Sequence, residues 1–131
     1  MDRRKRGRII TTTSILLLIF IMKNTLLQDL KDGKLIFTDV IAYIESAYNH
    51  TPTAFWNGEI HNEATQNQGS AKVLQFALIK SLSEEDTLQL FAEHYRAVLD
   101  DPNGNDHQNI RAFMLHGWEG VRFEGTALTI K

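Results

Sequence analysis

The stretch TPTAFWNGEIHNEATQNQGSAKVLQFA, residues 51–77, decides most of the fold, because two kinds of pattern meet in it. Short apolar runs flank Asn57-Gly58, a dipeptide typical of a tight hairpin turn because both positions accept a positive φ. A polar loop over residues 62–70 follows, and Ser70 is then a good N-cap for a helix. The stretch therefore predicts a β-hairpin that a polar loop joins to a helix.

Helical periodicity dominates the chain before this stretch. A short helix is expected between Asn24, as its cap, and Gly33, which is placed to end it in the left-handed conformation. A second helix is expected from Phe37 to Tyr48, with Thr38 as its cap. Its apolar positions recur every three or four residues: Phe37, Val40, Ile41, Ile44, Ala47 and Tyr48.

Three more helical segments follow the hairpin. Ser83 and Asp106 are the expected N-caps of the second and third, and Gly117 is placed to end the last. The apolar positions expected to face the core are Val73, Leu74, Ala77 and Leu78, then Leu88, Phe91, Tyr95 and Leu99, then Ile110, Phe113 and Met114. Alternating residues indicate short strands at 121–124 and 128–130. The sequence thus predicts a mostly helical α+β single domain with a small antiparallel β-hairpin and short C-terminal strands.

The composition fits one folded domain and excludes several functional classes. The chain has 131 residues, of which 43% are hydrophobic, enough for one core. It has no cysteine, which rules out a disulfide framework, a thiolate zinc site and a cysteine nucleophile. The net charge of the chain is −2. Residues 1–8 have a net charge of +4, so residues 9–131 have a net charge of −6. Such an acidic body argues against a nucleic-acid partner, which requires a basic face.

Residues 1–21 form an N-terminal extension in which a basic run precedes an apolar stretch. This order resembles a secretory signal, but no small-residue cleavage site follows it. The apolar stretch is also shorter than the roughly 20 residues that a transmembrane helix requires. Three interpretations stay open: an uncleaved membrane anchor, a signal peptide with a poor cleavage site, and an upstream extension of a protein whose translation starts at Met22. We expect the folded domain to span residues 22–131.

The polar loop concentrates groups that could bind a ligand. Amides, a carboxylate, a hydroxyl and an ammonium meet where the hairpin joins the helix, at Asn62, Glu63, Asn67, Ser70 and Lys72. A helix N-terminus attracts anions through its free N–H groups and its dipole, and Lys72 adds a positive charge. These residues could therefore form the floor of a polar pocket. The structural alternative is that Ser70 only caps the helix and the amides only satisfy turns.

A second candidate group lies at the start of the last helix. His107 and Arg111 are four residues apart and share a helix face, so they could bind a carboxylate or phosphate, or act as acid and electrophile. The alternative is a solvated face with Asp106 as the cap. The five histidines show no spacing diagnostic of a metal site, and we predict no metal: His50, His61, His94, His107 and His116.

No common catalytic or cofactor-binding signature is present, so we expect no cofactor. Several short motifs nevertheless follow one another in a specific order. They are Thr51–Phe55, Asn57-Gly58, Asn62–Lys72, Tyr95–Leu99, Pro102 with Gly104, Asp106–Met114, Gly117–Gly120 and Phe123–Gly125. Together they resemble the HopJ type III effector protein family over nearly all of residues 22–131. The resemblance implies a bacterial protein that a type III secretion system injects into host cells, and it implies no particular catalytic activity.

Two functions follow from these observations. The first is a small ligand-binding or interaction module, whose partner is an unknown small polar or anionic molecule or a protein. The second is an unclassified small enzyme, in which Glu63 or His107 acts as acid or base while Lys72 and Arg111 stabilise negative charge. The missing catalytic motifs favour the first. We expect a cytoplasmic location, with secretion into a host cell as an alternative; membrane contact is expected only if residues 9–21 are a real anchor.

Overall fold

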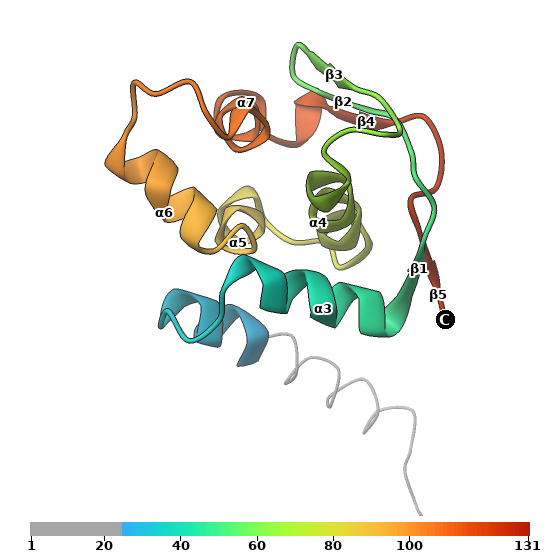
Figure 1. The fold of residues 1–131 in the computed structure, drawn as a ribbon, viewed down its shortest axis with the longest axis horizontal. Helices are drawn as coiled ribbons and strands as arrows, with labels where there is room; N and C mark the ends of the chain where they lie inside the picture. Colours follow the sequence, from blue (N-terminus) through green and yellow to red (C-terminus); the bar gives the residue numbers. More distant parts are fainter. Residues whose placement is uncertain (1–24) are drawn as a thin grey trace, which may run out of the picture.

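The computed structural model describes residues 25–131. After a first helix over residues 25–31, the helices are α3 (Phe37–Ala47), α4 (Gln68–Ile79), α5 (Glu84–Gln89), α6 (Glu93–Asp100) and α7 (Gln108–His116), followed by the 3-10 helix η1 (Gly117–Gly120). The strands are β1 (Tyr48–His50), β2 (Phe55–Asn57), β3 (Ile60–Asn62), β4 (Val121–Phe123) and β5 (Leu128–Ile130). This mostly helical α+β arrangement confirms the predicted fold class (Figure 1).

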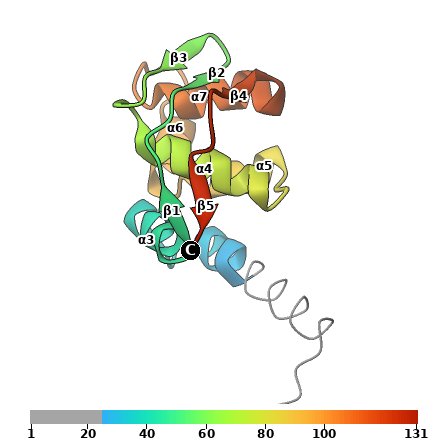
Figure 2. The same cartoon turned by 90° about the vertical axis from the view of Figure 1, so that its right-hand side faces the viewer.

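Helix α4 occupies the middle of the molecule. Figures 1 and 2 show α3 on one side of it, and α7 with the sheet of β2, β3 and β4 on the other. Its buried residues are Ala71, Val73, Leu74, Phe76 and Ala77, which surround much of the helix. Burial on several sides is typical of a helix inside a core. Leu78, expected to face the core, is 43% exposed, because it lies in the last turn, where the helix leaves the interior.

The predicted hairpin is present, but its turn lies one residue later than Asn57-Gly58. The register pairs Asn57 with Ile60, so Gly58 and Glu59 are the two turn residues. Gly58 has a φ of 60°, and glycine at the first turn position is typical of a type II′ turn. Asn57 therefore belongs to β2, where its side chain is completely buried. This shift matters for the site, because it places the Asn57 amide in the interior rather than in the turn.

The two predicted C-terminal strands are present and belong to different sheets. β4 extends the hairpin into the three-stranded antiparallel sheet β3-β2-β4, whereas β5 pairs with β1. The sequence pattern does not predict β1, because the helical periodicity from Phe37 includes Tyr48. In the structure α3 ends at Ala47, and Tyr48 pairs with Ile130. Figure 2 shows this two-stranded ladder beside the C-terminus.

The apolar run from Leu88 to Leu99 is divided between two helices. Ser83 caps α5 as predicted, because its hydroxyl accepts the Asp86 N–H at 3.1 Å. The chain then breaks at Ala92, whose φ of 52° ends the first helical path before α6 begins. Because the break turns the second helix, Leu99 is 51% exposed instead of facing the core. Met114 on α7, also expected to face the core, is 44% exposed and borders a hollow together with Leu99.

Three of the expected N-caps are wrong. Helix α3 begins one residue before Thr38, and its cap is Ile36, whose N–H donates to the Asp39 carboxylate at 2.9 Å. Ser70 lies inside α4, because the chain turns into the helix earlier, at Asn67. Asp106 precedes the true cap of α7, and its carboxylate is bound by an arginine instead.

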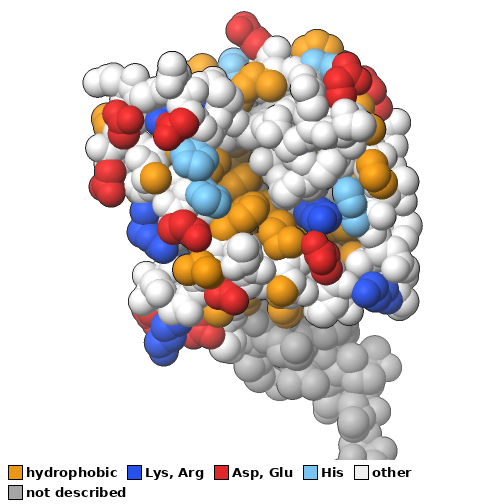
Figure 3. Space-filling view, viewed as in Figure 1, with side chains coloured by type: hydrophobic (Ala, Val, Ile, Leu, Met, Phe, Trp, Pro, Cys, Tyr) orange, Lys and Arg blue, Asp and Glu red, His pale blue; other side chains and the backbone are white. Residues whose placement is uncertain are grey.

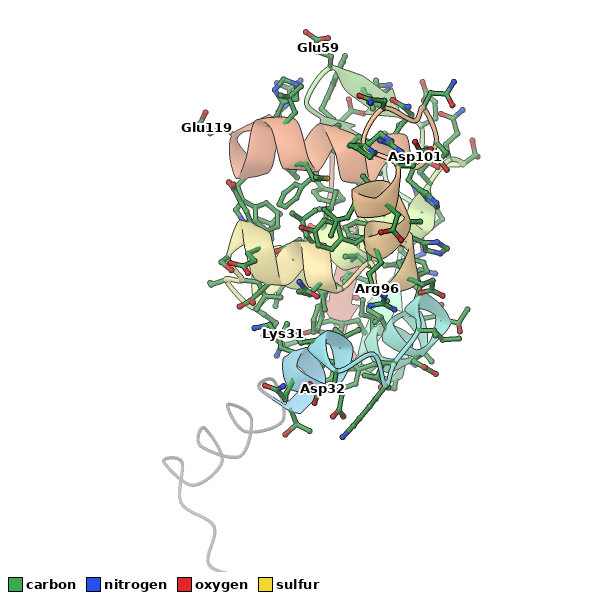
Figure 4. The ribbon with its side chains drawn as sticks, turned by 90° about the vertical axis from the view of Figure 1, so that its left-hand side faces the viewer. Lys31, Asp32, Glu59, Arg96, Asp101 and Glu119 are labelled. Carbon is green, nitrogen blue, oxygen red and sulfur yellow. The ribbon has the colours of Figure 1, made fainter. Side chains whose placement is uncertain are left out.

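Of the two ends predicted for the first helix, the structure describes only the C-terminal one. Gly33 ends the first helix with a φ of 72°, as predicted, whereas its expected cap Asn24 lies outside the described residues, as does the whole extension 1–21. In the part of the chain that the structure describes, no helix combines the length and the apolar character that crossing a membrane requires. Figure 4 shows charged side chains at the extremities of the molecule, with Glu59 at the hairpin turn and Asp32 at the opposite end.

Candidate functional site

A cavity of about 490 Å³ opens where α3 and α6 meet the first turns of α4 and α7. Its lining residues are Phe37, Asn67, Gly69, Ser70, Phe91, His94, His107, Gln108, Asn109 and Ile110. Figure 3 shows this face of the molecule hollowed at its centre, with hydrophobic side chains in the hollow and histidines at its border. Ligand pockets of small-molecule-binding proteins have volumes of roughly 300–1,000 Å³. The cavity therefore has the size of a binding site for a small molecule.

Four ring side chains follow one another along one wall of the cavity. Phe37 and Phe91 are stacked, with their centroids 6.1 Å apart and their planes 9° from parallel. His94 meets Phe37 edge to face at 5.0 Å, and the His107 ring lies 4.9 Å from that of His94. We call these four residues the ring wall. It is apolar at the phenylalanine end and carries ring nitrogens at the histidine end.

The two helices that carry Phe37 and His94 are fastened together at their first turns. Phe37 is the first residue of α3, and its backbone N–H donates to the Glu93 carboxylate at 2.7 Å. Glu93 is in turn the first residue of α6, directly before His94. A carboxylate stabilises a helix start because it accepts free N–H groups and complements the dipole. This bond fixes the phenyl ring beside the imidazole.

The opposite wall consists of two helix starts. Asn67 and His107 precede α4 and α7, both in the left-handed conformation, with φ values of 50° and 49°, and neither side chain caps its helix. The first backbone hydrogen bonds to these caps come from the N–H groups of Ala71 and Ile110. The N–H groups before them, in residues 68–70 and 108–109, meet no acceptor in the described part of the chain. Free donors at a helix start favour an anion.

A network of asparagine side chains holds the two helix starts side by side. The Asn62 Oδ1 atom accepts from Asn67 at 2.8 Å and from Asn109 at 3.0 Å. The Asn109 Oδ1 atom accepts from Asn57 at 3.0 Å and from Asn62 at 3.2 Å. Asn57 and Asn62 are completely inaccessible to solvent. Because one oxygen of the hairpin binds both helices, the hairpin sets the spacing of their first turns.

This network is satisfied except at one atom. Asn57 also donates to the Asn109 carbonyl at 2.8 Å, and Asn62 to the Phe55 carbonyl at 3.4 Å. The Asn57 Oδ1 atom is the one buried side-chain oxygen or nitrogen of the described residues that has no partner. Buried amides are stabilising only when their groups are paired. The paired amides therefore fix the positions of the two helix starts, whereas the unpaired Asn57 oxygen lowers the stability of the fold.

Four of the seven predicted ligand-binding residues lie at or directly behind the cavity. Asn67, Ser70 and His107 line it, and Asn62 supports it from behind through its bond to Asn67. The polar loop and the start of the last helix, which are far apart in the sequence, thus come together here.

Glu63 and Lys72 are engaged elsewhere. Glu63 is exposed, and its carboxylate lies 3.4 Å from a ring nitrogen of His61. The Lys72 ammonium lies 3.1 Å from the carboxylate of Glu45, which belongs to α3. Neither side chain lines the cavity. The predicted group of acid, base and cations is therefore not assembled around one point.

Arg111 fastens the loop before α7. Its guanidinium donates to the Asp106 carboxylate at 2.7 Å and to the carbonyls of Asp106 and Pro102 at 2.6 and 3.2 Å. The hydrogen bond from Arg111 lowers the pKa of the Asp106 carboxyl, and the charge of His107 adds to this effect. His107 itself lies 4.0 Å from the same carboxylate. Arg111 thus positions the segment that carries His107.

Sequence reasoning missed four members of the site: Phe37, Phe91, His94 and Asn109. His94 is one of five histidines without a diagnostic spacing. Phe37 and Phe91 occupy apolar helical positions that are indistinguishable from core positions in the sequence. Asn109 carries no signal beyond its place in the motif Asp106–Met114. The several asparagines in the motifs that resemble the family, such as Asn57, Asn62 and Asn67, were the signal that could have pointed to the network. In the described residues, no group of three or more histidine, aspartate or glutamate side chains is arranged to hold a metal ion.

The protein is a small α+β domain with a cavity that aromatic rings line and asparagine side chains support. Comparison with known proteins shows the family to which it belongs. The family model of the HopJ type III effector protein matches residues 23–128, and the chain belongs to this family. This confirms the resemblance inferred from the motifs. A similar solved structure is described as "Crystal structure of unknown function protein VPA0580". It is 46% identical, with a TM-score of 0.76, over 82% of this chain and 92% of that one. No curated protein matches.

Proposed function

We propose that the protein is a binding module that takes a small organic anion into the cavity between α3, α4, α6 and α7. The observation that carries this proposal is the meeting of two imidazoles with apolar rings in one hollow of ligand size. Among the described residues, neither the His94 ring nor the His107 ring makes a hydrogen bond, although His107 Nε2 lies 4.0 Å from the Asp106 carboxylate. The ring nitrogens of His94, and the His107 nitrogen that does not face Asp106, can therefore meet a ligand. Apolar lining with a few convergent polar groups is typical of small-molecule sites.

The donors around the cavity favour a negative charge on the ligand. The imidazoles, the Ser70 hydroxyl and the free N–H groups at the starts of α4 and α7 all donate, and the lining includes no carboxylate. Hydrogen bonds to an ionised acceptor are about twice as strong as neutral ones. A carboxylate or phosphate monoester therefore suits the cavity better than a neutral or cationic molecule.

The backbone around the cavity supports a built site. Asn67, Ala92 and His107 all have positive φ values, and each directly precedes one of the helices that border the hollow. Such conformations cost roughly 1–3 kcal/mol each when the residue is not glycine, and they gather at functional sites. The protein maintains three of them here, which favours a role beyond packing.

A glycine substitution tests the proposal without disturbing the core. A methyl group at Gly69 would lie 3.5 Å from the Phe37 ring, an ordinary contact, and would fill the cavity beside the free N–H groups. Gly125→Ala is the matched control, because its methyl group would lie 3.5 Å from Thr53, away from the cavity. We expect Gly69→Ala to weaken the binding of benzoate about fivefold or more, which is about 1 kcal/mol, and Gly125→Ala to leave it unchanged.

The measurement is an NMR titration that follows the backbone amides of residues 67–70 and 107–110. Benzoate is compared with benzamide, which has the same ring and no charge. We expect benzoate to shift these amides and benzamide to bind more weakly. Equal shifts with both compounds would refute the anion, and no shifts with any carboxylate or phosphate monoester of similar size would refute the binding function.

We propose that this binding takes place in a cytoplasm. The words "type III effector" in the name of the family describe proteins delivered into host cells, so the cytoplasm of a host is the alternative to that of the bacterium. Fusion to a reporter that is activated only inside host cells distinguishes the two. A signal that depends on an intact secretion system would place the protein in the host.

A further inference from the structure

We propose that the anion carries a planar aromatic ring attached directly, or through one or two bonds, to its charged group. This inference rests on the proposed function and names the class of ligand. It is carried by the ring wall and by the order of its members, with phenyl rings at one end and imidazoles at the other.

The spacing within the ring wall is suited to a further ring. Neighbouring centroids lie 4.9 to 6.1 Å apart, in stacked, edge-to-face and tilted pairs. Aromatic rings prefer these arrangements at about 4.5–7 Å, because the face of each ring is negative and its edge is positive. Phe37 is central to the series, contacts both Phe91 and His94, and is only partly buried. A planar ligand that reaches the exposed part of Phe37 gains the same kind of contact, whereas a saturated ring does not.

The order of the ring wall fixes how far apart the ring and the charge lie. His94 is one ring spacing from Phe37, and His107 is one further spacing away, directly before the free N–H groups of α7. A ligand ring against Phe37 therefore places a directly attached carboxylate or phosphate within reach of the imidazoles. A long aliphatic chain between ring and charge would carry the charge past them. Aryl carboxylates and aryl phosphates share this chemistry.

A matched pair of acids tests the ring without changing the protein. Benzoate and cyclohexanecarboxylate have the same number of carbon atoms and the same charge, and only benzoate is planar. We expect the wild-type protein to bind benzoate about three- to tenfold more tightly, which is the range that aromatic pairing contributes beyond burial. Intermolecular NOEs from benzoate protons to the Phe37 ring are expected in the same samples. Phenyl phosphate and cyclohexyl phosphate repeat the comparison for the second anion.

A substitution then assigns the preference to a residue. Phe37→Leu keeps an apolar side chain and removes the ring, so the preference for benzoate is expected to disappear. Phe123→Leu is the control, because it removes another stacked ring, 5.2 Å from Phe55 in the sheet and outside the cavity. Thermal melting of both variants shows that each is folded, and the NOEs in the wild type test the inference independently of either.

The outcomes separate the two proposals. Tighter binding of benzoate, lost in Phe37→Leu and retained in Phe123→Leu, supports the aromatic class. Equal affinity for the planar and saturated acids, with shifts at the cavity amides, overturns the aromatic class and leaves the anion-binding function in place. The absence of shifts at residues 67–70 and 107–110 with all four acids overturns the binding function itself.

Discussion

Two sets of polar side chains, one buried and uncharged, the other exposed and charged, have different roles in this molecule. The asparagine network of Asn57, Asn62, Asn67 and Asn109 joins the hairpin to two helices and is largely buried. The ion pairs, such as Lys72 with Glu45, lie at the surface with exposed carboxylates. Exposed pairs are weak because water competes for both charges. The comparison teaches that the uncharged amides, and not the charges, position the candidate site.

The largest expected effect follows from breaking the network at its centre. Asn62→Ala leaves the side-chain donors of Asn67 and Asn109 without their shared acceptor. Asn109 is buried, so its unsatisfied donor costs about 1–3 kcal/mol, whereas water can replace the acceptor of the exposed Asn67. We therefore expect the free energy of unfolding to fall by about 2–3 kcal/mol, and benzoate binding to weaken. Urea denaturation measures the loss, with the exposed strand residue Asn49→Ala as control. A loss below about 0.5 kcal/mol would refute the role of the network.

A smaller loss is expected at the edge of the network. Asn57→Ala removes two donated hydrogen bonds, but it also removes the buried Oδ1 atom that has no partner. We therefore expect a loss of about 1–2 kcal/mol, less than at Asn62 although both side chains are completely buried. The same denaturation experiment compares them. Because the two side chains are equally buried, a loss larger than that of Asn62→Ala would contradict the view that the number of satisfied groups decides the cost.

Substitution of one imidazole tests its contact with the anion. His94 lines the cavity, so His94→Gln is expected to weaken benzoate binding. The loss of one hydrogen bond costs about 1 kcal/mol, or about fivefold in affinity. The charged groups near the two imidazoles of the cavity are Asp106, 4.0 Å from His107, and Glu93, which binds the Phe37 N–H.

Calorimetric titration with benzoate measures this effect. His116→Gln, which changes an exposed histidine at the end of α7, is the matched control and is expected to leave the affinity unchanged. An equal affinity in His94→Gln and the wild type would exclude this imidazole as a ligand of the anion.

Removing an exposed ion pair is expected to have little effect. Lys72→Met keeps the aliphatic part of the side chain and removes its charge, so the free energy of unfolding is expected to change by less than about 0.5 kcal/mol. Benzoate binding is expected to stay the same, because Lys72 does not line the cavity. A clear loss of benzoate binding would show that Lys72 belongs to the binding site, as the sequence predicted.

The smallest effect concerns Asp106 in acid. Its pKa is lowered by the hydrogen bond from Arg111, so this bond stabilises the fold above the usual aspartate range and is lost as the pH falls through the lowered pKa. The melting temperatures of the wild type and Asp106→Asn are therefore expected to differ slightly at pH 7 and to converge below about pH 4. A difference that grows in acid would contradict the assignment.

The sequence predicts the elements of this fold better than their junctions. The hairpin, the two C-terminal strands and the helix ends at Gly33 and Gly117 follow from local patterns. The starts of α4 and α7 do not, because asparagine and histidine adopt a left-handed conformation there that tertiary contacts impose. The periodicity likewise cannot show the break at Ala92, since its side chain carries no helix-breaking signal.

The candidate site divides in the same way. The sequence finds Asn62, Asn67, Ser70 and His107 because polar groups beside a helix start are visible locally. It assigns Phe37 to the core, because only the packing of α3 against α6 leaves that ring at a cavity. Long-range pairing therefore decides which predicted residues meet, and no local pattern carries that information.

A crystal structure of the protein grown with benzoate tests the central claim most directly. The account predicts the ring against Phe37 and the carboxylate among His94, His107 and the N–H groups that begin α4 and α7. An empty cavity with benzoate bound elsewhere, or a carboxylate pointing to solvent away from both imidazoles, would contradict it.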